Sequence, residues 1–133
     1  SEDFESFPPA QQGPTFTNNW TSSGYSGWGW ESETGTGSNA NSSATGPLWD
    51  RTNFGVSNGI YMYMETSGGT VGDTTTLSSP LIYVDSTQTT LLLEYSFFNF
   101  GTLINRLDVL IDTNGVSNVV GSFVGPQQTS QTG

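Results

Sequence analysis

The chain has 133 residues, which is the size of one domain with a single core. It carries twelve acidic residues and two arginines, has no lysine, histidine or cysteine, and has a net charge of -10. Because such a surface repels phosphate backbones, nucleic acid is excluded as a partner, and the missing cysteines exclude disulfides and thiolate metal sites. No run of about 18 apolar residues occurs, so we expect no membrane insertion.

The sequence of the first half of the chain predicts one short strand, followed by a segment rich in aromatic residues and by loops. Residues 1–8 are expected to form an edge strand that ends at Pro8-Pro9, because proline cannot donate to a strand ladder. Trp28 and Trp30 are two positions apart and would share one face of a strand. Residues 32–46 are rich in Ser, Thr, Asn and Gly and predict a long loop that does not pack by itself.

The second half predicts a series of strands separated by turns, and no segment has the periodicity of a helix. Asn58-Gly59 and Asn114-Gly115 are turn signals, and the most apolar segment, 91–98, is expected to be a central strand. The pattern predicts an all-β fold, an antiparallel two-sheet, jelly-roll-like β-sandwich. The expected strands are Ile60–Glu65, Thr74–Leu77, Leu81–Val84, Leu91–Phe98, Leu107–Ile111 and Val119–Val124.

The residue types argue against catalysis. Without histidine, lysine or cysteine the chain has no Ser-His-Asp triad, no Schiff-base amine and no thiol nucleophile. A pair of carboxylates could still hydrolyse a glycoside, but the sequence does not show such a pair. We therefore expect a non-catalytic protein.

Five short motifs, in the same order and at similar spacing, resemble the MAM (meprin/A5/mu) domain family. Each motif alone is common, and the five together span the chain. They are Asp3-Phe4-Glu5, the spaced tryptophans Trp20, Trp28 and Trp30, Thr45-Gly46-Pro47-Leu48-Trp49-Asp50-Arg51-Thr52, Gly59-Ile60-Tyr61-Met62-Tyr63-Met64-Glu65, and Leu77-Ser78-Ser79-Pro80.

The resemblance implies a single β-sandwich domain over residues 1–133 that works in adhesion or recognition outside the cell. Two features depart from the family pattern. The family's usual cysteines are absent, as in bacterial-type versions, and its C-terminal strands are expected to be missing after the polar end at 127–133. One sheet would then present an open edge, which favours self-association.

A calcium site is the first candidate, because carboxylates and amide oxygens are the only ligands available and they suit Ca²⁺. By resemblance, Glu5 and Asp50 would bind a structural ion, with Asp73 or Asp3 as a third ligand. The alternative is that these acidic residues are solvated or cap turns.

The aromatic residues are the second candidate. Trp28, Trp30 and Trp49 would form a platform on which a sugar ring stacks, or would instead be core residues. The sequence therefore supports an extracellular adhesion module that binds a protein at the cell surface. The alternative is a polysaccharide-binding module attached to a secreted polysaccharide-degrading enzyme.

Overall fold

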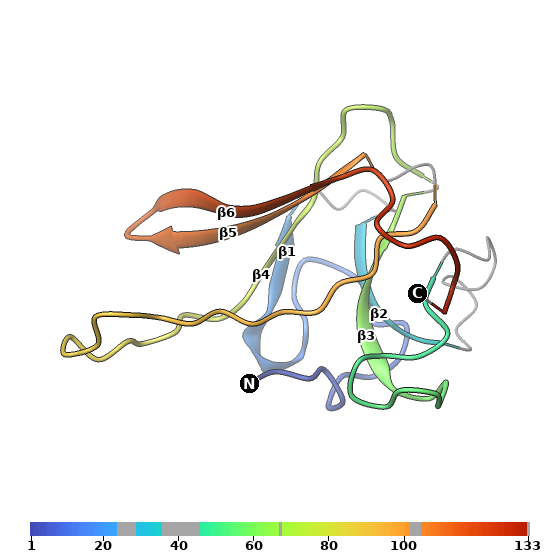
Figure 1. Ribbon diagram of the computed structural model, residues 1–133, viewed down its shortest axis with the longest axis horizontal. Coiled ribbons are helices and arrows are strands. Elements are labelled where there is room, and N and C mark those ends of the chain that lie inside the picture. The colour runs from blue at the N-terminus through green and yellow to red at the C-terminus, as the bar shows by residue number, and fades with distance from the viewer. Residues whose placement is uncertain (24–28, 36–45, 67, 102–104, 133) are drawn as a thin grey trace.

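The structure is a computed structural model that describes residues 1–23, 29–35, 46–66, 68–101 and 105–132. Within these ranges the regular elements are strands and one helical turn, η1 (Thr17–Asn19). The six strands pair antiparallel in three two-stranded sheets, β1 with β4, β2 with β3 and β5 with β6. The prediction of an all-β, antiparallel fold is confirmed, and the arrangement is consistent with a β-sandwich (Figure 1). The strands are β1 (Thr21–Ser23), β2 (Gly29–Thr34), β3 (Ile60–Glu65), β4 (Thr76–Ser78), β5 (Arg106–Thr113) and β6 (Val116–Val124).

The body of the molecule forms around the β2–β3 sheet. Ile60 and Met62 of β3 lie on the same face as Trp30 of β2, because alternate residues of a strand point to the same side. This face packs against Phe7 and Phe16 from the N-terminal segment, and Phe7, Phe16 and Ile60 are the buried apolar core among the described residues. The predicted strand 60–65 and its apolar face are confirmed.

The N-terminal segment completes this sheet without forming the predicted edge strand. Residues 1–8 contain a turn in which Phe7 N donates to Phe4 O at 2.9 Å, and Phe4 has a φ of 65°, which a strand does not allow. The edge is instead covered by the next residues, where Ala10 N donates to Ser32 O at 2.7 Å and Ser32 N donates to Gln11 O at 3.0 Å. The chain therefore passes along β2 after the two prolines rather than before them.

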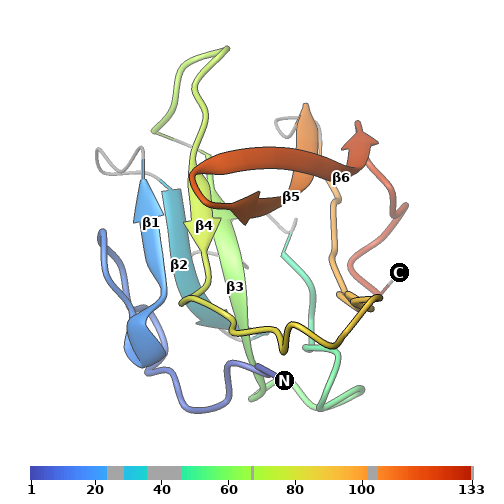
Figure 2. The ribbon, with the colours of Figure 1, turned by 90° about the vertical axis from the view of Figure 1, so that its left-hand side faces the viewer.

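The β5–β6 hairpin projects from this body (Figures 1 and 2). Asn114 and Gly115, with φ of 55° and 78°, form its two-residue turn, as the sequence predicts. The register shifts between Val109 and Leu110, so one residue of β6 is left over as a bulge. Both strands of the hairpin are longer than predicted.

A second projection is formed by residues 81–98, which we call the apolar arm. Strands were predicted at 81–84 and 91–98, and both predictions are wrong, because no neighbouring described strand provides a ladder for either segment. The arm turns at Asp85, where Gln88 N donates to Asp85 O at 2.9 Å, and follows an elongated path away from the body (Figure 1). Most of its apolar side chains are consequently exposed.

Candidate functional site

Two of the three predicted metal ligands, Glu5 and Asp50, lie together beside the start of β3. Glu5 Oε1 accepts hydrogen bonds from Ile60 N at 3.1 Å and from Asn53 Nδ2 at 2.9 Å. Asp50 is 6% exposed, and its two oxygens accept the amides of Thr52 and Asn53 at 3.0 and 2.8 Å. The loop before β3 therefore holds Asp50 against the Glu5 carboxylate.

The proximity of the two carboxylates changes the proton affinity of Glu5. Partial desolvation raises the pKa of Glu5 above its ordinary value, and the hydrogen bond with Asp50 and the negative charge of Asp50 raise it further. The hydrogen bond from the Ile60 amide opposes this shift. A cation between the two groups would remove the same repulsion. Gly59 makes room for the pair, since a Cβ at this position would overlap the Asp50 carboxylate and lie 2.8 Å from Asn53 Nδ2.

Asp73 lies apart from this pair. Its Oδ2 accepts Thr70 N at 2.7 Å, which closes the turn between β3 and β4. Asp3 accepts Glu5 N at 3.2 Å and contributes negative charge near Glu5. In the ranges that the structure describes, no group of three or more acidic side chains is arranged to hold a metal ion. The structure thus joins Glu5 with Asp50 and does not add Asp73 to them.

Trp30 and Trp49, two residues of the predicted aromatic platform, lie in different parts of the structure. Trp30 is half-buried and packs against the core, and its indole Nε1 is buried without a hydrogen-bond partner. Trp49 is half-buried in the loop before β3 and contacts Phe54 edge to face, with ring centroids 5.1 Å apart. Trp28 lies outside the described residues. Of the predicted sugar-binding residues that the structure describes, Trp49 is therefore the one that is not part of the core.

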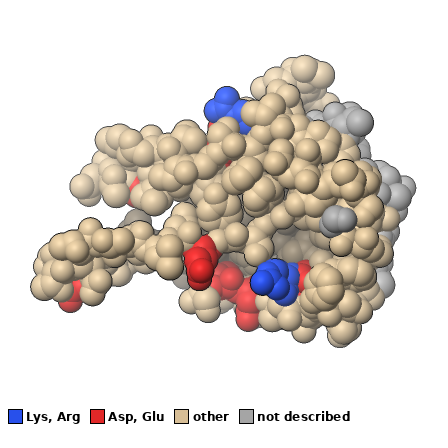
Figure 3. All heavy atoms as spheres, viewed as in Figure 1, with Lys and Arg blue, Asp and Glu red and all other residues tan. Residues whose placement is uncertain are grey.

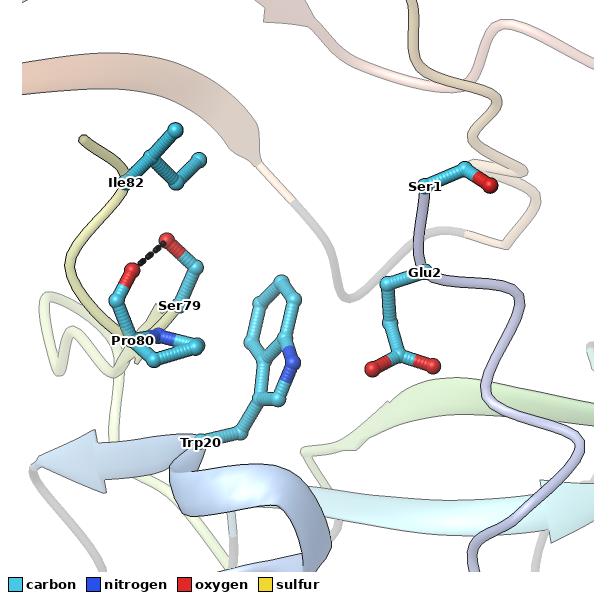
Figure 4. A pocket seen from close by; sticks show the side chains of 6 residues that line it. All are labelled: Ser1, Glu2, Trp20, Ser79, Pro80 and Ile82. Carbon is cyan, nitrogen blue, oxygen red and sulfur yellow. Dashed lines mark hydrogen bonds between the residues drawn. The ribbon is translucent and has the colours of Figure 1, made fainter. Parts of the chain in front are cut away.

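A small pocket beside Trp20 was not predicted. It has a volume of about 320 Å³, and Figure 4 shows the Trp20 indole facing Pro80 on one side and Glu2 on the other. The pocket is also lined by Ile82, the second residue of the apolar arm. No sequence signal identifies it, because its walls come from the N-terminus, from Trp20 just before β1 and from the segment after β4, which are distant in sequence.

The burial of two glutamates of β2 was also not predicted. Glu31 and Glu33 are 1% and 2% exposed and lie on the face opposite the core, beside Tyr63 and Tyr61 of β3. Gln12 Nε2 donates to Glu31 Oε2, and burial together with the negative charge of Glu33 raises the pKa of the Tyr61 hydroxyl. The signal that could have found them is their i, i+2 spacing opposite the alternating tyrosines of β3.

The apolar arm is an unusual surface of the described residues. Leu81, Tyr83 and Leu92 are 86%, 93% and 78% exposed, and Leu91 is more than half exposed. The base of the arm is fixed by Asn99, whose Nδ2 donates to Gly125 O at 2.9 Å and whose backbone N donates to the Gln128 side chain. Exposed apolar areas larger than a few hundred Å² are unusual on a monomeric domain and mark interaction sites.

Comparison with known families supplies the identity. The model of the MAM domain, meprin/A5/mu, matches residues 10–131. The chain belongs to the MAM domain family. The resemblance inferred from the motifs is thereby confirmed, and this MAM domain is a version without cysteines. No solved structure matches the chain.

Membership in the MAM domain family indicates the general function of the domain. MAM domains are β-sandwiches that act as adhesion-type interaction modules, are generally non-catalytic, and occur in extracellular and cell-surface proteins. Within the described part of this MAM domain, no helix has the length and apolar character needed to cross a bilayer.

Proposed function

We propose that this MAM domain is a non-catalytic protein-interaction module of a larger secreted or cell-surface protein, and that the apolar arm is its recognition surface. The observation that carries the proposal is the exposure of Leu81, Tyr83 and Leu92 on a segment anchored at its base by Asn99. Burial of such side chains stabilises a complex by about 25 cal/mol per Å² of apolar area, before the costs of association.

A bead-adhesion assay tests this function. Beads coated with the domain are expected to bind to beads or cells that display its partner, and Tyr83→Asp should abolish binding because it places a charge in the contact. Val71→Asp is the matched control, since Val71 is fully exposed in the turn between β3 and β4, away from the arm in sequence. Equal binding by both variants, or no binding by the unaltered domain, would reject the proposal.

A polysaccharide-binding module attached to a secreted enzyme is the second candidate function. It is supported by the contact of Trp49 with the exposed Phe54 ring, because sugar rings stack on aromatic faces. A polysaccharide array is the test, with Trp49→Ala beside the unaltered domain and Trp30→Ala as a fold control. Specific binding that is lost in Trp49→Ala supports this candidate, and a blank array removes it.

We further propose that Glu5 and Asp50 bind a structural Ca²⁺ ion. Their carboxylates meet beside the loop that precedes β3, and a bound cation offsets their repulsion. A ligand at about 100 times its dissociation constant stabilises the native state by about 2.7 kcal/mol, so calcium should raise the melting temperature and chelator should lower it. Glu5→Gln should remove this difference and Asp73→Asn should keep it. Identical melting in calcium and chelator would eliminate the site.

A further inference from the structure

The pocket beside Trp20 has an apolar side and a negatively charged side. Pro80 and Ile82 lie on one side of the Trp20 indole, and the Glu2 carboxylate lies on the other (Figure 4). Its volume of about 320 Å³ is close to the lower limit of about 300 Å³ for pockets that hold a small ligand. The pocket therefore suits a single side chain that is apolar along its length and positively charged at its end.

The fold holds the carboxylate and the indole in place. Glu2 is half-buried, its Oε1 accepts a hydrogen bond from Phe4 N at 2.9 Å, and its Oε2 accepts one from Asn18 Nδ2 at 3.1 Å. The Trp20 ring contacts the Phe4 ring edge to face, with centroids 5.1 Å apart. Because a carboxylate has about four lone-pair sites, each oxygen of Glu2 can accept a further hydrogen bond from a ligand.

No basic side chain of the chain lines this pocket. The sequence has two arginines and neither lysine nor histidine. Arg106 Nε donates to Asp108 Oδ1 at 2.8 Å, and Arg51 is exposed in the loop before β3. Figure 3 shows acidic side chains, with one basic group beside them, gathered where the lower projection, the apolar arm, joins the body. A cationic ligand from outside the chain is consequently attracted to this region.

Other classes of ligand match the pocket poorly. An anion would face the charge of Glu2, and a purely apolar side chain would desolvate that charge without pairing it. Ca²⁺ takes six to eight oxygen ligands, whereas Glu2 is the only acidic residue that lines the pocket. An arginine side chain matches both sides, because its guanidinium stacks on aromatic rings and donates two parallel hydrogen bonds to a carboxylate, while its methylene groups cover apolar surface.

We propose that the pocket beside Trp20 binds an arginine side chain of the partner protein. The guanidinium lies on the Trp20 indole and donates to the Glu2 carboxylate, and the methylene groups cover Pro80 and Ile82. The proposal rests on the proposed function, because Ile82 belongs to the apolar arm and is 72% exposed, so a partner that covers the arm also reaches the pocket. The pocket adds a requirement for positive charge, which the apolar side chains of the arm do not impose.

Titration with a single blocked amino acid tests the pocket without the partner. Nα-acetyl-arginine methylamide should shift the indole N–H resonance of Trp20 saturably in a proton–nitrogen correlation spectrum, and Trp20→Phe identifies that resonance by its loss. The citrulline analogue has the same shape without the charge and should bind at least about fivefold more weakly. Glu2→Gln should raise the dissociation constant of the arginine probe by a similar factor. Asp112→Asn, which removes the same charge from an exposed position on β5, should leave it unchanged.

Three results would overturn the proposal: no saturable shift of the Trp20 resonance, equal binding of the arginine and citrulline probes, or equal dissociation constants for Glu2→Gln and Asp112→Asn. The bead assay separates this inference from the proposed function. Adhesion that Tyr83→Asp abolishes and Glu2→Gln leaves unchanged would refute only the arginine pocket. Saturable, charge-dependent binding of the arginine probe by a domain whose beads do not adhere would support the pocket and reject the proposed function.

Discussion

The contribution of the N-terminal segment to the core can be tested at Phe7. Its side chain is 3% exposed, packs with Phe16 and Ile60, and meets Phe4 edge to face at 5.3 Å between ring centroids. Truncation of a buried phenylalanine to alanine costs about 3–5 kcal/mol, through lost transfer energy and the cavity that remains. A domain of this size has a total stability of about 5–15 kcal/mol, so Phe7→Ala should remove a large share of it.

Urea unfolding followed by tryptophan fluorescence measures this loss. With a urea dependence of about 1–3 kcal/mol per molar, the midpoint should fall by at least about 1 M in Phe7→Ala. Phe54→Ala removes the same ring from a position that is 71% exposed and should change stability by less than about 0.5 kcal/mol, apart from its contact with Trp49. Equal midpoints for the two variants would refute the packing of the N-terminal segment against β2 and β3.

Three further predictions concern the loop beside β3 and the base of the arm. Gly59→Ala should destabilise the domain by about 1–3 kcal/mol in urea unfolding, because the added methyl group displaces Asp50; unchanged stability would contradict this geometry. Asn99→Ala should cost at least about 1 kcal/mol and speed amide exchange at the base of the arm, since it removes a buried hydrogen bond; unchanged exchange would count against the anchor. In chelator, the raised pKa of Glu5 means that the folded state binds its proton more tightly than the unfolded state. Stability should therefore increase as the pH falls through this raised pKa towards the ordinary value of 4.5, and Glu5→Gln should lose that increment in melts at several pH values.

Strands whose partners are close in sequence were predictable. Residues 107–111 and 119–124 flank the Asn114-Gly115 turn, and the turn chemistry together with the apolar residues specifies the hairpin. In this hairpin the local pattern and the pairing agree. The alternation of Ile60 and Met62 with Tyr61 and Tyr63 specified the two faces of β3, but not its partner β2, which is distant in sequence. The predicted loop at 32–46 was wrong at residues 32–34, which belong to β2.

The arm and the N-terminus were not predictable in the same way. Residues 91–98 have the composition of a central strand, but a strand requires a neighbour, and composition does not provide one. At the N-terminus, Phe4 and Phe7 are three positions apart, which no strand places on one face, and the observed turn brings their rings together. Periodicity identifies apolar residues more reliably than it identifies their hydrogen-bond partners.

The candidate site was found only in part. Glu5 and Asp50 are 45 positions apart, and their proximity was inferred from the family resemblance, not from spacing. The burial of Glu31 and Glu33 was not predicted, because burial of a carboxylate depends on what covers the sheet. The pocket beside Trp20 joins three separate segments and has no local signature.

The central claim is that the apolar arm is a protein-recognition surface. Hydrogen–deuterium exchange of the unaltered domain, measured free in solution and bound to beads that display its partner, tests it most directly. The amides of residues 89–98 should exchange rapidly in the free domain, since they have no hydrogen-bond partners among the described residues, and should become protected in the bound domain. Rapid exchange of these amides in the bound domain, or protection confined to another segment, would contradict the account.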